Sequence, residues 1–309
     1  MVVTGGASAR AGDLLLGAHL STAGGVSTAL ERARELRCTA VQILTHNRAQ
    51  WRIAHPPDEQ VARFRDLQAR HGPFRLAAHA SYLVNPASAD RALRERSVRT
   101  LIAEARHCGA LGIPRLVLHP GSHLGAGEGA GLRRVVAALD RVHAATAGMA
   151  VQTLLETTAG QGTGLGHRFE QLAEILAGLA QPDRAGVCFD TAHAFAAGYD
   201  FRRPELYAAM WTAFDRSIGL GRLALFHLND SRTPAGSRVD RHTHIGRGAI
   251  GGAPFGWILA DARFRLVPKV IETPKDGDMD RRNLTLLRRL ARRTPAHEGL
   301  PRAPRRGGA

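Results

Sequence analysis

The chain has 309 residues, and its 42 Lys and Arg against 27 Asp and Glu give a formal net charge of +15. That length holds one large domain or two small ones, and a positive balance of this size favours polyanionic partners, nucleic acid first. Three widely separated cysteines argue against a disulfide framework, and no segment has the character of a signal peptide or membrane helix, so we expect a cytoplasmic protein with no membrane partner.

The two ends of the chain differ from the rest in composition. Residues 1–12 are small, polar and glycine-rich, and residues 292–309 combine Pro, Gly and Arg with almost nothing apolar. We expect both to be disordered tails, the second of them basic, around a single domain at residues 13–291. The arginines from Arg281 onwards are either a solvated helix face and tail or a weak contact strip for nucleic acid.

Short apolar runs recur along that domain and predict eight β-strands. In chain order they cover residues 14–19, 40–44, 76–79, 116–119, 153–156, 186–190, 223–229 and 269–272. Amphipathic helical patterns fill the gaps, for example at residues 25–36, from Ala92 onwards, and at residues 169–179. Strict alternation implies right-handed crossovers and a parallel sheet, and eight strands favour closure into a single (β/α)₈ TIM barrel of the α/β class.

Six of these eight strands end at or contain, near their carboxyl end, a residue type that binds metals. These residues are His79, His119, Glu156, Asp190, His227 and Glu272. The carboxyl ends of the strands are where such barrels build active sites, so the six side chains should share one basin. One strand-end His is more often a core residue than a ligand, but the joint pattern reverses that expectation, and a set without thiolates suits zinc or manganese.

Two further pairs enlarge this set. His193 follows Asp190 by three positions, and Asp240 and His242 lie two residues apart in the long irregular segment 229–252. Nine ligands are too many for one zinc ion and enough for three if a carboxylate is shared. Multinuclear sites of this kind suit phosphate esters, because two neighbouring cations stabilise the attacking and leaving oxygens of an in-line displacement.

Other features leave their interpretation open. His244 is ambiguous, since it lies two residues past His242, whereas His107, His143 and His167 are expected at the surface. The glycine-rich segment 158–166 either lets backbone N–H groups approach a phosphate or is a βα loop that needs positive φ angles.

These motifs together resemble endonuclease IV, the family of metal-dependent apurinic/apyrimidinic endonucleases of base-excision repair. The resemblance extends from residue 14 to about residue 290 and is carried by GAHLSTAGGV, HASYLVNPA, LHPGSH, LETTAGQGTGLG, GVCFDTAHAFAAGYD, HLNDSRTPAGSRVDRHTHIGRGAIG and IETP. It implies hydrolysis of the phosphodiester on the 5′ side of an abasic site in double-stranded DNA, which leaves a 3′-hydroxyl and a 5′-deoxyribose phosphate.

The resemblance also implies three Zn²⁺ per chain, with Mn²⁺ as an alternative at one position, and a catalytic role for Glu156 in orienting or deprotonating the nucleophile. The three implied sets are His79, His119 and Glu156; Glu156, Asp190, His227 and Glu272; and His193, Asp240 and His242. The residues assigned to DNA contact are Arg48, Tyr82, Gln161 and Arg241, with Arg48 one position earlier than the arginine usual in the family. We expect a monomer with no obligate protein partner.

Two other functions compete with this interpretation. A sugar isomerase or epimerase on a similar barrel would use one or two cations and would have no role for the two extra pairs. A protein that binds abasic lesions without cutting them would not need an open multinuclear site.

Overall fold

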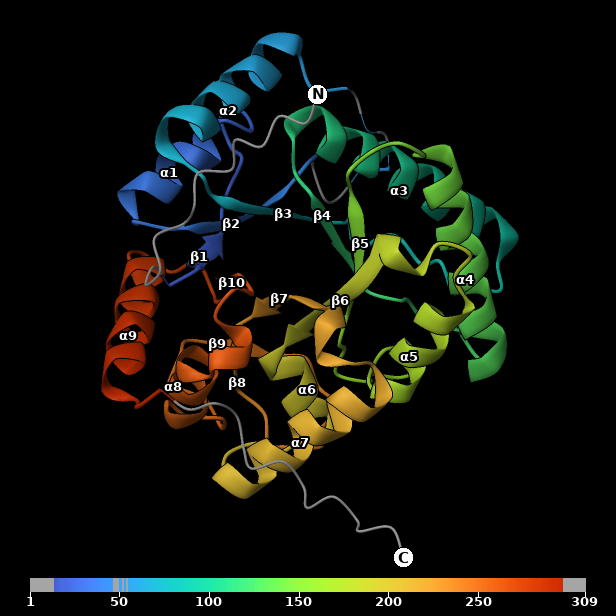
Figure 1. Cartoon of the computed structure of the whole chain (residues 1–309). Helices are drawn as coiled ribbons and strands as arrows, with labels where there is room; N and C mark the ends of the chain where they lie inside the picture. Colours follow the sequence, from blue (N-terminus) through green and yellow to red (C-terminus); the bar gives the residue numbers. More distant parts are fainter. Residues whose placement is uncertain (1–13, 47–49, 52, 54, 297–309) are drawn as a thin grey trace, which may run out of the picture.

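The computed structural model describes residues 14–46, 50, 51, 53 and 55–296 (Figure 1). The predicted tail at residues 1–12, Arg48, and all of the predicted C-terminal tail beyond residue 296 lie outside this description. Within it, eight parallel strands close into a barrel in the order β1-β10-β7-β6-β5-β4-β3-β2, with helices around the outside, so the predicted TIM barrel is confirmed. The barrel strands are β1 (Leu16–His19), β2 (Ala40–Leu44), β3 (Arg75–His79), β4 (Arg115–Leu118), β5 (Gln152–Glu156), β6 (Ala185–Asp190), β7 (Leu223–His227) and β10 (Lys269–Ile271).

The helices alternate with the strands as expected. They are α1 (Thr28–Glu35), α2 (Asp58–His71), α3 (Arg91–Leu111), α4 (Glu128–Ala145), α5 (Phe169–Gly178), α6 (Thr191–Ala197), α7 (Pro204–Ser217), α8 (Ala253–Ala260) and α9 (Met279–Arg293), with short 3₁₀ turns at Pro182–Arg184, Leu220–Arg222 and Ala262–Phe264. The described part of the chain contains no helix long and apolar enough to cross a membrane.

Local sequence explains where several of these elements begin and end. Helix α3 starts one residue before its predicted start because the Asp90 carboxylate accepts hydrogen bonds from the N–H groups of Ala92 and Leu93. Helix α9 continues two residues past the predicted domain end at 291; its apolar face buries Leu284 and Leu287, and Leu290 and Ala291 pack against the core. Strand β7 ends at His227 and not at Asn229, whose N–H donates to the Thr191 hydroxyl (2.8 Å) instead of continuing the sheet.

The segment 229–252, expected to be irregular, is an ordered hairpin. Strands β8 (Asp230–Ser231) and β9 (His242–Thr243) pair antiparallel. The buried Asp230 carboxylate accepts hydrogen bonds from the N–H groups of Gly246 (2.9 Å), Gly248 (3.0 Å) and Ile250 (3.0 Å). This carboxylate fixes both ends of the loop and therefore holds Asp240 and His242 in place.

Two apolar layers form the core. One lies between the barrel and its helices, where aromatic rings such as those of Phe189 and Trp211 pack with centroids 4.8 Å apart. The other fills the inside of the barrel with the small to medium side chains of Ala40, Ala77, Val117, Leu154, Cys188, Leu225 and Val270. The inner layer closes the barrel directly beneath the strand ends, so the basin there has an apolar floor.

Candidate metal centre

The ends of the barrel strands meet in one basin and carry the predicted ligands into it. Strand register explains part of this: Asp190 on β6 lies directly beside His227 on β7, and Glu156 on β5 lies beside Cys188. All nine predicted ligands lie within the described residues. Six of them lie at the ends of neighbouring barrel strands. The other three come from α6 and from the β8–β9 hairpin, which lie above the strand ends.

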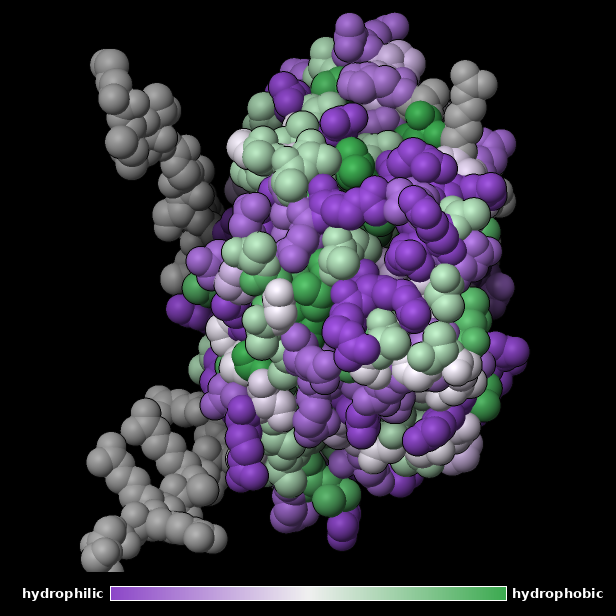
Figure 2. Space-filling model, turned by 90° about the vertical axis from the view of Figure 1, so that its right-hand side faces the viewer, coloured by the Kyte–Doolittle hydropathy of each residue, from purple (hydrophilic) through white to green (hydrophobic). Residues whose placement is uncertain are grey.

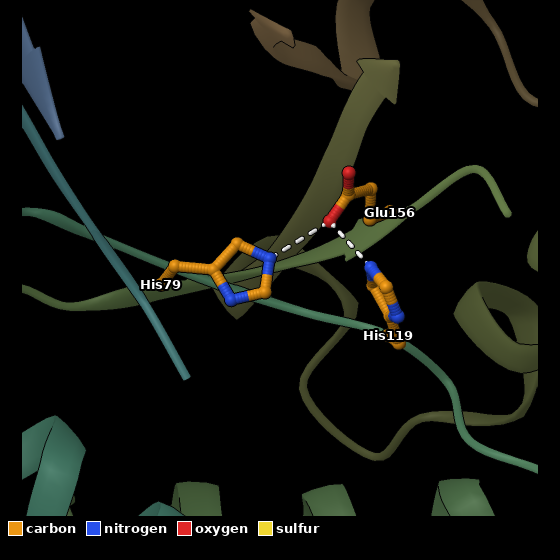
Figure 3. A group of neighbouring side chains, drawn as sticks. All are labelled: His79, His119 and Glu156. Carbon is orange, nitrogen blue, oxygen red and sulfur yellow. Dashed lines mark hydrogen bonds and ion pairs between the residues drawn. The ribbon is translucent and has the colours of Figure 1, made fainter. Parts of the chain in front are cut away.

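The Glu156 carboxylate lies at the centre and contacts different imidazoles with its two oxygens. Its Oε2 lies 2.9 Å from His79 Nε2 and 3.1 Å from His119 Nε2, and Figure 3 shows both rings directed at this one oxygen. Its Oε1 lies 2.8 Å from His227 Nδ1 and 3.3 Å from His193 Nδ1. Since Glu156 is fully buried, a carboxylate divided in this way is suited to bridge two cations.

The potential ligand atoms fall into three groups within each of which all atoms lie within 4.8 Å of one another. Among the described residues these are His79, His119 and Glu156; Glu156, Asp190, His227 and Glu272; and Asp190, His193 and His242. The first two match the sets expected from the sequence. In the third, Asp190 takes the place expected for Asp240.

Asp240 nevertheless lies next to the third group. Its Oδ2 is 3.1 Å from His193 Nε2, and its Oδ1 is 3.3 Å from His242 Nε2. The third group is therefore His193 and His242 between two carboxylates, one from the barrel and one from the hairpin. Binding of metal by these nine residues stays a prediction, but the geometry brings all of them together.

Burial and charge pairing set the protonation of these groups. Burial opposes ionisation of Glu156, but the charges of His227 and His119 hold its pKa well below the usual range. Burial alone would lower the pKa of His79, yet the hydrogen bond and charge of Glu156 raise it to about 9. Likewise the pKa of Asp240 falls to about 2, because its pairing with His193 outweighs desolvation. A metal ion bound here would take the place of these imidazole protons, since a ligating imidazole must be neutral.

Most of the imidazoles are oriented for that exchange. One ring nitrogen faces a backbone carbonyl or an amide: His79 Nδ1 lies 2.7 Å from the Ala80 carbonyl, His193 Nδ1 lies 2.9 Å from the Thr157 carbonyl, and His227 Nε2 lies 2.8 Å from Gln42 Oε1. An N–H that donates in this direction leaves the lone pair of the other nitrogen directed into the basin. The nitrogen and oxygen donors thus fit zinc or manganese.

Three polar residues around the ligands were not predicted as part of the site. Gln42 is completely buried, and its Nε2 donates to Glu272 Oε1 (2.5 Å) and lies 2.9 Å from His19 Nδ1. Asn229 donates to Asp190 Oδ2 (2.7 Å) and accepts from the Glu272 N–H (2.7 Å). A period-two pattern was the available signal for the first two, because Gln42 and His19 lie two positions after Ala40 and Gly17 on strands that face the barrel interior.

The residues assigned to DNA contact lie differently around this basin. Tyr82 is 59% exposed and lines two adjoining openings of about 260 and 420 Å³, which share His79, His119, His193 and Asp240. Gln161 is exposed and lines the smaller opening. Arg241 is exposed outside both openings, and its guanidinium donates to the Asp240 carbonyl (2.8 Å). Arg48 lies outside the described residues.

The other histidines considered in the sequence lie outside the ligand groups of the described residues. His244 lies between Asn283 of α9 and Asp276, with its Nδ1 3.2 Å from Asn283 Nδ2 and its Nε2 3.5 Å from Asp276 Oδ2. The expectation of surface positions was wrong for His107 and His143, which are 4% and 0% exposed, because each lies on the inner face of its helix.

The glycine-rich segment is held mainly by the protein itself. Gly160, Gly162 and Gly166 have positive φ angles. The N–H groups of Leu165 and Gly166 donate to the Gly121 carbonyl (2.8 Å) and to Gln171 Oε1 (2.9 Å). These contacts favour the interpretation as a tightly folded βα loop over that of a phosphate cradle.

Comparison with known proteins agrees with this geometry. Residues 30–295 match the family of xylose isomerase-like TIM barrels. A protein of Geobacter sulfurreducens named probable endonuclease 4 is 49% identical over 285 residues, which are 92% of this chain and 96% of that protein. The crystal structure of endonuclease IV from Thermus thermophilus superposes with a TM-score of 0.81 at 36% identity and covers 90% of this chain and 98% of the other.

A D-tagatose 3-epimerase-like protein superposes with a TM-score of 0.71 at 18% identity, covering 90% of this chain and 97% of that chain, so this likeness concerns the fold alone. The two relatives named endonuclease match nearly their whole length at much higher identity. The chain therefore belongs to the endonuclease IV family within the xylose isomerase-like TIM barrels.

Proposed function

We propose that this protein is an apurinic/apyrimidinic endonuclease of base-excision repair. It hydrolyses the phosphodiester on the 5′ side of an abasic site in double-stranded DNA and leaves a 3′-hydroxyl and a 5′-deoxyribose phosphate. The observation that carries the proposal is the division of the Glu156 carboxylate, with one oxygen at His79 and His119 and the other at His227 and His193. A bridging carboxylate between two ligand groups is suited to phosphoryl transfer.

The residues of the chain would divide the work as follows. His79, His119 and Glu156 would hold one zinc ion; Glu156, Asp190, His227 and Glu272 a second; and His193, His242 and Asp240 a third, with Mn²⁺ as an alternative occupant at one position. Bound zinc supplies Lewis acidity, which lowers the pKa of water and offsets charge on phosphate oxygens. Glu156, kept ionised by its imidazole neighbours, would orient or deprotonate the attacking water.

Further side chains around the basin would position the DNA. The net charge of +15 attracts the phosphate backbone, and exposed Tyr82 at the mouth of the basin would stack in the gap left by the missing base. Gln161 and Arg241 would contact the backbone on either side, and Arg48 would insert into the duplex. The enzyme would act as a monomer in the cytoplasm.

A sugar isomerase or epimerase remains the second candidate, because a D-tagatose 3-epimerase-like protein shares the barrel. Metal content separates the two. About three zinc ions per chain support the nuclease, whereas one or two ions with turnover of a ketose support the isomerase.

The decisive experiment is incubation of the zinc-loaded protein with a duplex that carries one abasic analogue. We expect one incision directly 5′ to the lesion, and the new end should be a 3′-hydroxyl that a DNA polymerase extends. Glu156→Gln is the matched control, since it preserves shape and removes the charge. An intact strand in both reactions would overturn the proposal.

A further inference from the structure

Four arginines surround a hollow on the outer side of the barrel, between α3 and α4. Its volume is about 330 Å³, and it is lined by Arg94 and Val98 of α3 and by Ala130, Arg133, Arg134, Ala137, Ala138 and Arg141 of α4. None of these residues lines either opening at the metal centre. Figure 2 shows the side of the molecule on which α3, α4 and α5 lie, with strongly hydrophilic side chains gathered around small apolar areas. We call this hollow the arginine pocket.

Small residues of α4 explain why a hollow exists between the two helices. Ala130, Ala137 and Ala138 do not fill the groove between α3 and α4, and buried Val98 and Ala138 form its apolar floor. The long arginine side chains stand around this floor and bring their guanidinium groups to its rim. The result is a concave site with a cationic rim and no carboxylate among its lining residues.

Two of the arginines are already fixed in position. Arg94 Nη1 donates to the Ser88 carbonyl (2.7 Å), and Arg141 binds Glu95 through two nitrogens (2.7 and 2.9 Å). The Glu95 contact uses one positive charge of the four, so the pocket keeps a net positive charge. A cationic site with fixed members loses little side-chain entropy when an anion binds.

Arg134 is the member that calls for a ligand. Its Nη1 atom is buried and has no hydrogen-bond partner among the described residues. A hydrogen bond left unmade at a buried donor destabilises the folded state, so such atoms in folded proteins usually meet a partner. Nη1 has no acceptor among the described residues, and a phosphate oxygen would supply one that also carries the opposite charge.

We propose that the arginine pocket binds a phosphoryl group. Arginine presents a planar set of donors that matches the oxygens of phosphate. Several arginines around one concavity suit a phosphoryl group, whose oxygens point in several directions, better than they suit a planar carboxylate. The volume admits a phosphate together with part of the molecule that carries it. The phosphoryl group comes either from a free phosphate compound or from the backbone of nucleic acid, which are two sources of the same chemistry.

Thermal unfolding of the zinc-loaded enzyme with inorganic phosphate or pyrophosphate, at constant ionic strength, tests binding. Arg134→Gln is compared with Arg216→Gln, which removes the same charge from an exposed site on α7. Binding at the metal centre is common to both variants, so the difference between them reports the arginine pocket.

We expect Arg134→Gln to bind at least about fivefold more weakly and to show a smaller rise in Tm, while Arg216→Gln behaves as the parent. Without phosphate, Arg134→Gln should unfold at the same or a higher temperature, because an unpaired buried donor is gone. Arg133→Gln, at an exposed position, gives the same comparison if Arg134→Gln fails to fold. The proposal is overturned if the pocket variants respond to phosphate as Arg216→Gln does and if the salt dependence of DNA binding is also unchanged.

Salt dependence of binding to long and short lesion-bearing duplexes separates the two sources. If backbone phosphates occupy the pocket, the slope of log K against log salt falls by about 0.9 for Arg133→Gln on the long duplex only. If free phosphate is the ligand, that slope is unchanged while the phosphate response is lost. Either result supports a phosphoryl site. A failure to cleave the lesion would count against the proposed endonuclease function but not against the arginine pocket, because both readouts of the pocket measure binding.

Discussion

Two neighbouring layers inside the barrel differ completely in character although they lie only two residues apart along each strand. The lower layer is the apolar set Ala40, Ala77, Val117, Leu154, Cys188, Leu225 and Val270. Adding two to each number gives Gln42, His79, His119, Glu156, Asp190, His227 and Glu272. Side chains two apart on a strand point to the same face, so each strand contributes one packing residue and, above it, one polar residue of the site.

Strand β1 follows the same rule with one adjustment. His19 lies two positions after Gly17, and a Cβ at Gly17 would lie 1.6 Å from the Ala40 carbonyl oxygen. Only glycine fits there, because β2 approaches so closely. The difference between the layers teaches that packing and chemistry are carried by successive inward-facing positions of the same strands. Substitutions in one layer should therefore leave the other largely intact.

The largest expected effect comes from removing the bridging charge in the upper layer. Glu156→Gln keeps the side-chain volume but loses the charge that pairs with His79, His119 and His227. We expect single-turnover incision to fall about 10³–10⁴-fold and zinc per chain to decrease, because both ligand groups that share this residue lose an anionic donor. Elemental analysis and a cleavage assay on the same preparation measure both.

The matched change in the lower layer is Leu154→Ala, two residues before Glu156. Leu154 is fully buried, and loss of its side chain should lower the free energy of unfolding by about 2–5 kcal/mol. Denaturant titration measures this loss, and zinc content should stay at the parental value. A variant that is as stable as the parent but loses zinc would contradict the separation of the two layers.

A polar member of the upper layer that is not itself a ligand should have an intermediate effect. Gln42→Leu removes the amide that donates to Glu272 and faces His227 Nε2. Loss of a hydrogen bond that orients ligands typically weakens metal binding by about 10–100-fold. Competition with a chelator measures the affinity, and Ala40→Ser in the layer below is the control that should leave it unchanged.

Much of this organisation was predictable from the sequence. The eight strands and the six ligand-type strand ends follow from apolar runs that stop at His, Asp or Glu. Gln42 and His19 were missed because they are polar residues within or at the end of apolar runs, and the period-two pattern places them in the ligand layer only when the strands are aligned with one another. The third ligand group was only partly predicted, since its membership depends on how the β8–β9 hairpin folds over the barrel.

Local sequence patterns were also insufficient to predict which histidines are buried. His143 lies 3.0 Å from the Thr153 hydroxyl and is completely buried, and this contact joins α4 to β5. Helix faces are assigned by tertiary packing, and a single polar residue on an apolar face gives no local signal of its partner.

A second buried glutamate shows what the imidazoles contribute to Glu156. Glu104 on α3 is also 0% exposed, but its main partner is the Ser81 N–H (2.9 Å), and His46 Nδ1 lies 3.4 Å away. Burial raises the pKa of Glu104 to about 8, against the hydrogen bond from Ser81 that lowers it, whereas the pKa of Glu156 is held well below the usual range. Glu104 is therefore protonated in the folded protein at neutral pH and ionised in the unfolded chain.

Glu104→Gln should consequently remove a pH dependence of stability. The folded state binds a proton that the unfolded chain releases above its ordinary pKa of 4.5, so the stability due to Glu104 is fully present below that pH and is lost as pH rises towards 8. Each pKa unit corresponds to about 1.4 kcal/mol, and relaxation around the charge reduces the sum, so we expect the variant to gain on the order of 1 kcal/mol over the parent between pH 5 and 8.

Denaturant unfolding of both proteins at pH 5, 6.5 and 8 measures this gain. Glu95→Gln is the control, because Glu95 is a partly exposed glutamate of the same helix and its pKa is lowered by Arg141 and not raised. A constant difference between Glu104→Gln and the parent at all three pH values would mean that Glu104 stays ionised when buried.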